Sequence, residues 1–270
     1  MNHNRNTFRY QSNAASNDIK GAMLSSRLWL HLGWSDIQQR YRGSILGPLW
    51  ITLSMIVFVV ALSIVYSRLF HQDIKTFMPF LTTGMLCWSF ISTVLIESTD
   101  VFVNSKSFID NIKLPYLIYI LRLVWRNHIV FFHNLIVFVA VALFFKLQLS
   151  LNTLLFFPAF ILVSALLTCI SVVIALLGTR FRDVPPVISS LIMVVFFISP
   201  VTWHADMIGA NSLIIRLNPL YYILDVMRSP LLGIAPAIDS WIICLGMFGV
   251  FFTFSFILYS KYRSRIPFWI

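Results

Sequence analysis

The sequence predicts an all-α integral membrane protein with six transmembrane helices, an N-terminal amphipathic interface helix and short re-entrant outer helices between spans five and six. Hydrophobic residues make up 59% of the chain and charged residues only 11%, against about 25% charged residues in soluble domains. Six long stretches contain no Asp, Glu, Lys or Arg: Gly43–Ser67, Thr76–Ile96, Asn127–Phe145, Leu147–Thr179, Val184–Ala205 and Ser240–Ser260. Crossing a hydrocarbon core of about 30 Å takes roughly 20 apolar residues, and continuous rather than alternating apolar runs favour helices.

Two regions precede the first span. Residues 1–21 are rich in Asn and Ser and lack the apolar core of a signal peptide, so we expect a mobile cytoplasmic tail. Ala22–Asp36 is expected to form the interface helix, because Trp29 and Trp34 suit a surface that is half wet.

Residues 22–270 are expected to form a single transmembrane domain. Its outer segment, Trp203–Ser240, contains two apolar stretches, 213–217 and 219–227, that we expect to dip back into the membrane. The expected spans are residues 48–67, 77–96, 129–145, 153–177, 184–200 and 242–259.

The net charge of +10 would suggest a nucleic-acid partner in a soluble protein. Here the positive charges follow the membrane topology. Six crossings place both termini on one side, with 15 of the 20 Lys and Arg residues. The positive-inside rule assigns that side to the cytoplasm, so we expect contacts with membrane lipids and no nucleic acid. The opposite side holds Arg68, Lys75, Lys146, Arg216 and Arg228.

Sequence motifs for enzymatic chemistry are missing. The chain contains no GxSxG, HExxH or GxxxxGK[ST] motif, so it is not expected to be an enzyme or to hydrolyse ATP by the usual route. No Cys/His spacing suits a metal, and Cys87, Cys169 and Cys244 lie in different spans. A membrane-embedded enzyme acting on polyprenyl phosphate remains an alternative. Its candidate acid/base residues would be Glu97, Asp100 and His128.

Two charged segments have a functional and a topological interpretation. Arg40-Tyr41-Arg42 directly precedes the first span. Two guanidiniums beside an aromatic ring at headgroup depth can clamp a phosphate or pyrophosphate, but positive-inside anchoring explains the same residues. Arg180-Phe181-Arg182-Asp183 rigidly joins spans four and five. This link can transmit a push between spans or act as an anchor.

Four motifs, in order, carry a family resemblance. Arg40–Trp50, with the sequence RYRGSILGPLW, resembles the start of the first span in ABC exporter permeases of the type-2 branch. It looks most like permeases that export O-antigen, capsule and teichoic acid polymers. The three further matching pieces are Asn104…Lys113-Leu114-Pro115, Arg180–Val184 and Asn218-Pro219-Leu220. The resemblance covers about residues 24–262.

The resemblance implies a homodimer bound to two copies of a separate ABC ATPase. That ATPase would bind ATP and Mg, so no cofactor is expected in this chain. The implied substrate is a polysaccharide of the O-antigen type linked to undecaprenyl pyrophosphate, exported across the bacterial inner membrane. Export of teichoic acid, capsule or a small amphiphile are alternatives, and a passive channel would conduct without an ATPase.

The resemblance also implies residue roles. The substrate's pyrophosphate would pass Arg40, Tyr41 and Arg42, and the outer gate would lie in Leu213–Leu232. Contacts that couple the chain to the ATPase would come from Asn104, Ser107, Phe108, Asp110, Lys113, Arg180, Arg182 and Asp183. Residues of the channel lining and outer gate would be Phe58, Phe196, Phe197, Trp203, Asn218, Pro219, Tyr221 and Tyr222.

Overall fold

The computed structural model describes residues 2–208 and 212–270, and all regular structure in these ranges is helical. The α-helices are α1 (Asn2–Leu24), α2 (Ser26–Arg40), α3 (Leu49–Leu69), α4 (Ile74–Ser98), α5 (Lys106–Asn111), α6 (Leu117–Phe144), α7 (Phe156–Arg180), α8 (Val184–Ile198), α9 (Leu213–Arg216), α10 (Pro219–Leu231), α11 (Ile238–Tyr262) and α12 (Ile266–Trp269). The 3₁₀ helices are η1 (Leu151–Leu155), η2 (Ala205–Ile208) and η3 (Arg263–Arg265).

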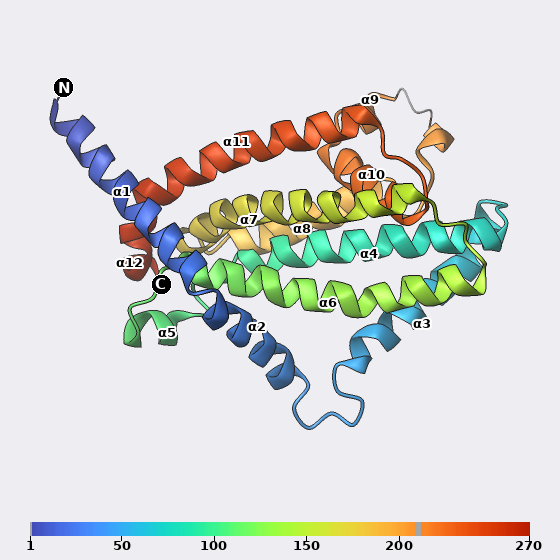
Figure 1. Cartoon of the computed structure of the whole chain (residues 1–270), viewed down its shortest axis with the longest axis horizontal. Coiled ribbons are helices and arrows are strands. Elements are labelled where there is room, and N and C mark those ends of the chain that lie inside the picture. The colour runs from blue at the N-terminus through green and yellow to red at the C-terminus, as the bar shows by residue number, and fades with distance from the viewer. Residues whose placement is uncertain (1, 209–211) are drawn as a thin grey trace.

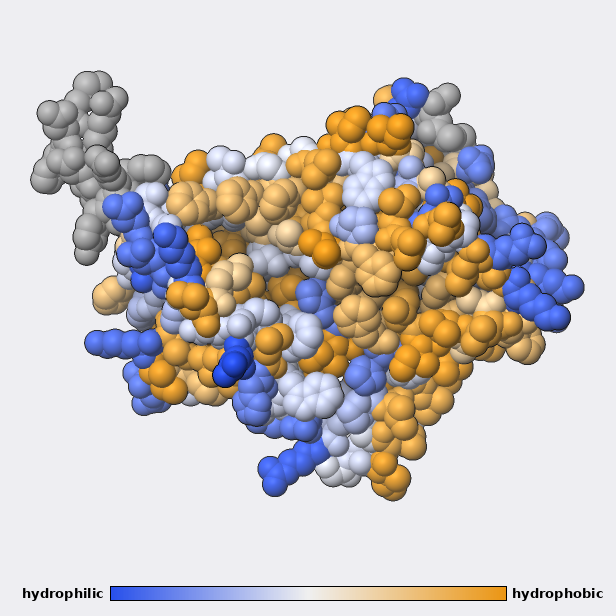
Figure 2. Space-filling view, viewed as in Figure 1, coloured by the Kyte–Doolittle hydropathy of each residue, from blue (hydrophilic) through white to orange (hydrophobic). Residues whose placement is uncertain are grey.

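The long helices lie side by side in one bundle (Figure 1). Hydrophobic residues cover much of the face drawn in Figure 2, and hydrophilic residues gather mainly toward its two ends. Five segments of the described chain are long and apolar enough to cross a membrane: Leu49–Leu69, Ile74–Ser98, Leu117–Phe144, Leu151–Arg180 and Ile238–Trp269. Five of the six expected spans thus correspond to helices of sufficient length.

The remaining expected span corresponds to α8, which is shorter than predicted. Its 15 residues extend about 22 Å at 1.5 Å per residue, short of a core of about 30 Å. The helix ends because Ser199 precedes Pro200 and has extended backbone angles, φ −86° and ψ 142°. In Figure 1 the chain still runs along the bundle between the end of α7 and the region of α9 and α10. The count of six full crossings stays a prediction.

Both chain termini lie at the same end of the bundle, together with α5 and α12 (Figure 1). We call this the α5 end, and the opposite end, which carries α9 and α10, the α10 end. An ion pair of 3.1 Å between Asp18 Oδ1 and Arg263 Nε ties the N-terminal helix to the C-terminal segment. Tyr259 also donates its hydroxyl hydrogen to Asp18.

The N-terminal region differs from its prediction. In place of a mobile tail, α1 is a helix that packs along α11, with Ala15 and Ala22 fully buried. Small residues let the two helices approach closely, and Asp18 is buried because Arg263 and Tyr259 satisfy its carboxylate. The interface helix α2 begins and ends four residues later than expected, at Ser26 and Arg40.

The third span begins much earlier than predicted, at Leu117 rather than residue 129. The predicted start comes from the uncharged stretch that begins at Asn127, with an earlier start as the alternative if Arg122 and Arg126 extend to the membrane interface. In the structure both lie within α6 and pair with carboxylates of neighbouring helices. Because their charges are satisfied by partners, the helix continues from Pro115-Tyr116 without a break.

Helix α4 forms the centre of the bundle. In an apolar stretch of 18 residues within α4, 72% of the residues are buried, against 22% in α3 and 11% in the Ile238–Trp269 segment. It packs against α3, α6, α7, α8 and α10. The α10 end is closed by α10, which buries Ile223, Leu224 and Met227 against α4, α7 and α11. Two short helices, α9 and α10, lie where short re-entrant helices were expected, and their placement on the outer side of a membrane stays a prediction.

A glycine at the α5 end sets the distance between α7 and the turn after α4. A Cβ atom at Gly178 would lie 2.0 Å from the carbonyl oxygen of Thr99. No ordinary side chain fits there. Gly249 in α11, by contrast, has open space around its missing Cβ.

We expect Gly178→Ala to lower the free energy of unfolding by about 1–3 kcal/mol, because the backbones must separate. Gly249→Ala is the matched control and should be neutral or stabilising by up to about 1 kcal/mol, because alanine favours an open helix position. Thermal unfolding of both variants in the same detergent measures the difference. Equal melting temperatures would contradict the close approach.

Candidate functional site at the α5 end

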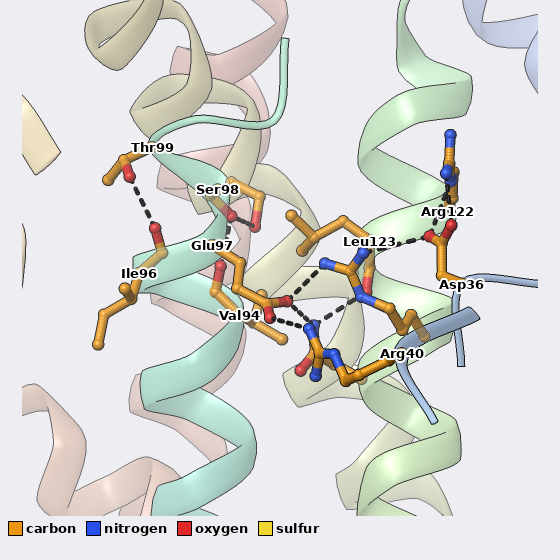
Figure 3. Close-up of polar contacts among 12 residues, drawn as sticks. Asp36, Arg40, Val94, Ile96, Glu97, Ser98, Thr99, Arg122 and Leu123 are labelled. Atoms are coloured by element: carbon orange, nitrogen blue, oxygen red, sulfur yellow. Dashed lines mark hydrogen bonds and ion pairs between the residues drawn. The ribbon is translucent and has the colours of Figure 1, made fainter. Parts of the chain in front are cut away.

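Five charged side chains meet where α4 ends, near the α5 end. Helix α2 contributes Asp36 and Arg40, α4 contributes Glu97, and α6 contributes Arg122 and Arg126. We call this group the charged cluster (Figure 3). It joins three helices that are far apart in the sequence.

The two carboxylates share three guanidiniums. Arg122 binds Asp36 through two hydrogen bonds, with its Nε 2.8 Å from Oδ2 and its Nη2 on Oδ1. Arg126 bridges both acids, with Nη1 3.1 Å from Asp36 Oδ2 and Nη2 2.7 Å from Glu97 Oε2. Arg40 Nη2 lies 3.2 Å from Glu97 Oε1. Because every charge in the cluster has an opposite partner, the group can lie at the edge of an apolar bundle.

Local spacing explains how these residues line up. Asp36 and Arg40 are one helical turn apart on α2, and so are Arg122 and Arg126 on α6. The helices come close because Gly33 lacks a side chain: a Cβ there would lie 2.8 Å from Trp125 Cδ1. The side chain of Asp36 is only 10% exposed.

A cavity of about 350 Å³ adjoins the cluster. Two buried polar atoms beside it have no hydrogen-bond partner among the described residues: the hydroxyl of Tyr119 and Nε of Arg126. Polar residues lining the cavity are Arg40, Glu97, Asp100, Asn104, Ser105, Tyr119, Arg122 and Arg126. Such a cavity can hold a polar or anionic group with guanidinium and hydroxyl donors.

Of the three predicted substrate residues, Arg40 lines this cavity, and Tyr41 and Arg42 follow it in the chain. Arg40 is bound to Glu97, so its guanidinium is oriented rather than free. Tyr41 ends α2, and Arg42 is exposed in the following turn. Gly43 has a φ of +82°, a conformation that favours glycine, and reverses the chain toward α3.

The predicted coupling residues of the first segment form a projection at the α5 end. Ser107 and Asp110 on α5 are exposed, and Asn104 and Lys113 flank the helix. Phe108 is half-buried beneath Arg122, whose Cζ lies 5.3 Å from the ring centroid. The projecting helix therefore contacts the charged cluster directly.

The second predicted coupling segment lies at the same end. Arg180, Arg182 and Asp183 are exposed at the link between α7 and α8. Helix α12 contacts both segments: Arg180 Cζ lies 5.3 Å from the ring centroid of Trp269, and Lys106 Nζ lies 3.1 Å from the Ile270 oxygen. The structure thus brings the two predicted segments to one surface.

The predicted channel residues are spread over two helices and a turn. Phe58 on α3 and Phe197 on α8 are exposed, 48% and 63% respectively, on the surface of the single chain. Phe196 packs against Trp88, with ring centroids 5.3 Å apart. Trp203 donates from Nε1 to the Phe197 carbonyl at 3.3 Å. Their place in a channel stays a prediction.

The predicted gate residues surround the start of α10. Asn218 is buried, caps the helix through the Leu220 N–H at 3.0 Å, and donates to Ser199 Oγ at 2.8 Å. Pro219 occupies the first helical turn, where it loses no hydrogen bond. Tyr221 stacks edge-on against Tyr222, whose hydroxyl bonds the Arg216 carbonyl at 2.9 Å.

Arg228 of α10 binds the segment that follows the C-terminal end of α8. Its Nη2 lies 2.7 Å from the Pro200 carbonyl and 3.2 Å from the Val201 carbonyl. Its Cζ lies 4.3 Å from the Phe80 ring centroid. The side chain thereby satisfies carbonyl groups of the segment that follows α8. From the sequence Arg228 is only one of the outer charges, whereas in the structure it is buried.

The residues of the enzymatic alternative have structural partners. Glu97 is paired with Arg40 and Arg126, and Asp100 accepts a bond from Thr99. His128 lies 2.9 Å from Ser164 Oγ, among phenylalanine rings. Within the described ranges, no three His, Cys, Asp or Glu side chains lie together as metal ligands would.

Comparison with known proteins identifies relatives across most of the chain. The family described as ABC-2 type transporter matches residues 27–232. An O-antigen export system permease protein RfbA from Myxococcus xanthus is 26% identical over 201 residues, 72% of this chain and 75% of the relative. A protein of the same name from Klebsiella pneumoniae is 26% identical over 187 residues, 68% of this chain and 72% of the relative. A second protein of this name from Klebsiella pneumoniae is 25% identical over 187 residues, again 68% of this chain and 72% of the relative.

We expect Arg126→Ala to lower the free energy of unfolding by about 2 kcal/mol, because it leaves Asp36 and Glu97 each short of a partner. Arg42→Ala removes an exposed arginine nearby and should change stability by less than about 0.5 kcal/mol. Thermal unfolding in detergent compares them. Equal effects would show that the cluster contributes nothing beyond an ordinary surface charge.

Proposed function

This chain belongs to the ABC-2 type transporter family, and we propose that it is the channel subunit of an ATP-driven exporter of lipid-linked, O-antigen-type polysaccharide. The polymer would move from the cytoplasmic to the outer side of the bacterial inner membrane. The observation that carries this proposal is the likeness, over about 70% of the chain, to permeases named for O-antigen export. The five long apolar helices agree with a protein that crosses the membrane several times.

The family implies an ABC ATPase partner, and we propose that two copies bind at the α5 end. This chain has no phosphate-binding loop, so ATP and Mg would be held by the ATPase. The exposed faces of α5 and of the α7–α8 link support this location, because both project from one surface. That surface would then face the cytoplasm, as the excess of Lys and Arg suggests.

The charged cluster supplies a route from the ATPase to the substrate. A push on α5 would reach Arg122 through Phe108, since the ring lies against the guanidinium. Arg122 and Arg126 hold Asp36, and Arg126 with Glu97 holds Arg40. Displacement of α5 would therefore move the Arg40-Tyr41-Arg42 segment, which we propose receives the pyrophosphate of the lipid carrier.

A second copy of the chain would complete the channel. Helix α3 exposes most of its apolar surface, and no residue of α8 is buried within the single chain. Bringing such faces together around a shared axis would place Phe58, Phe196, Phe197 and Trp203 near the pathway. Aromatic rings hold sugar rings weakly, which permits a polymer to slide. Asn218, Pro219, Tyr221 and Tyr222 would form its outer gate.

The first experiment is co-purification with the ABC ATPase, followed by ATP hydrolysis in lipid vesicles with and without lipid-linked glycan. We expect a stable complex whose turnover responds to the glycan. A response to a small amphiphile alone would instead support drug-like export. Ion or solute conduction without the ATPase would support a passive channel, and failure to form a complex would contradict the proposal.

We expect charge reversal at Arg180 and Arg182, or deletion of Ser107–Asp110, to abolish export while ATP hydrolysis continues, because force no longer reaches the permease. Reversal of Lys75 and Lys146 at the α10 end is the matched control and should leave export intact. Export is followed as glycan reaching the cell surface, and hydrolysis as phosphate release. Unchanged coupling would refute the assignment of these segments.

We expect the double variant Arg40→Gln, Arg42→Gln to reduce export at least about tenfold, because charge-assisted bonds to the pyrophosphate are lost. Assembly with the ATPase should persist. Arg68→Gln removes an exposed arginine from the other end of α3 and should export normally. If the double variant fails to insert into the membrane, the two arginines act as topological anchors.

A further inference from the structure

An apolar groove runs along α7 between α6 and α11, away from the charged cluster. Its volume is about 260 Å³. Figure 1 shows α7 between the two flanking helices, with α1 crossing one end of the group. Residues of all four helices line the groove, including Met23, Leu121, Ala165, Cys169, Phe252 and Tyr259.

A polar cavity of about 290 Å³ adjoins this groove at the α5 end. It is lined by Asp18, Lys113, Tyr116 and Arg263, and by Ile109 of α5. Asp18, which lines the polar cavity, accepts a hydrogen bond from Tyr259, which lines the groove. Arg263 pairs with Asp18, whereas Lys113 is exposed and makes no hydrogen bond or ion pair within the described residues. The polar cavity therefore has one positive charge in excess.

The groove has the length of one membrane leaflet. From Tyr259 at the polar end to Phe248 at the far end, α11 advances about 16 Å at 1.5 Å per residue. Half of a hydrocarbon core is about 15 Å. Apolar grooves do not hold water, and the surrounding solvent at this depth is lipid chains. An acyl chain from the leaflet at the α5 end therefore matches the groove in chemistry and in length.

We propose that the groove and the polar cavity together bind one anionic glycerophospholipid. An acyl chain lies along α7, and the headgroup phosphate contacts Lys113 and Arg263. Helix α1 forms the wall that separates this lipid from the bulk membrane, through Ile19 and Met23. Basic residues at a membrane surface favour anionic over zwitterionic headgroups, which accounts for the headgroup class.

The chain offers its own control for this site. Another apolar groove, of about 270 Å³, lies between α3, α4 and α6. Its lining is entirely apolar and includes Val59, Met78, Val137 and Ala140. Since no charged residue lines it, it can take an acyl chain but cannot select a headgroup.

The test is native mass spectrometry of the full chain released from nanodiscs of phosphatidylglycerol or phosphatidylcholine. We expect the wild type to retain one phosphatidylglycerol and to hold phosphatidylcholine more weakly. Lys113→Gln should weaken phosphatidylglycerol binding about fivefold, because one basic residue near the headgroup is lost. Ala165→Phe fills the groove and should abolish retention, whereas Ala140→Phe in the control groove should not.

Several outcomes would overturn the proposal. Equal retention of both lipids would remove the headgroup selection, and equal losses in Ala165→Phe and Ala140→Phe would show unselective lipid contact. Displacement by inorganic phosphate alone would indicate a phosphate site without a lipid, and preferential retention of polyprenyl phosphate would name a different occupant. Circular dichroism checks folding. If Ala165→Phe does not fold, Lys113→Gln decides the matter. The measurement needs no ATPase, so its result is independent of the proposed export.

Discussion

The arrangement of the α5 end depends on the guanidinium of Arg126, which binds Asp36 of α2 and Glu97 of α4 at once. Removing it would leave Asp36 paired with Arg122 alone and Glu97 paired with Arg40 alone, and each carboxylate would lose part of its compensation where apolar spans begin. Helix α2 is consequently held against α6, and the turn carrying Arg40 toward α3 is held in place with it. The position of the first span at this end therefore follows from an ionic contact as much as from hydrophobic packing.

The long apolar stretches were sufficient to predict five membrane-length helices, because a span is a property of one continuous segment. The charged cluster was not predictable in the same way. Arg122 and Arg126 look like ordinary anchors at a span boundary, and the partners that keep them inside α6 come from distant segments. Arg40 was identified from its motif, but its contact with Glu97, 57 residues away, has no local signal.

Composition also misled at the N-terminus. Asn and Ser are common in disordered segments, yet α1 needs only a narrow stripe to pack on α11. That stripe consists of Ala15, Asp18 and Ala22, spaced three and four residues apart as on one helix face. Its acidic member, Asp18, pairs with Arg263, which directly follows α11. The helical spacing of Ala15 and Ala22 is visible in the sequence, whereas the surface that they pack against is not.

The proposed lipid site and the charged cluster both contact α5, through neighbouring residues. Ile109 of α5 and Lys113, two residues after the end of this helix, line the polar cavity. Phe108 of α5 lies under Arg122 of the charged cluster. A six-residue helix has little stability of its own, so its position is set by these flanking contacts. A bound anionic headgroup would add a contact at the polar cavity and leave the contact between Phe108 and Arg122 in place. The lipid would thus restrict the helix on which the ATPase is proposed to act, and lipid composition would adjust how well its movement reaches Arg40.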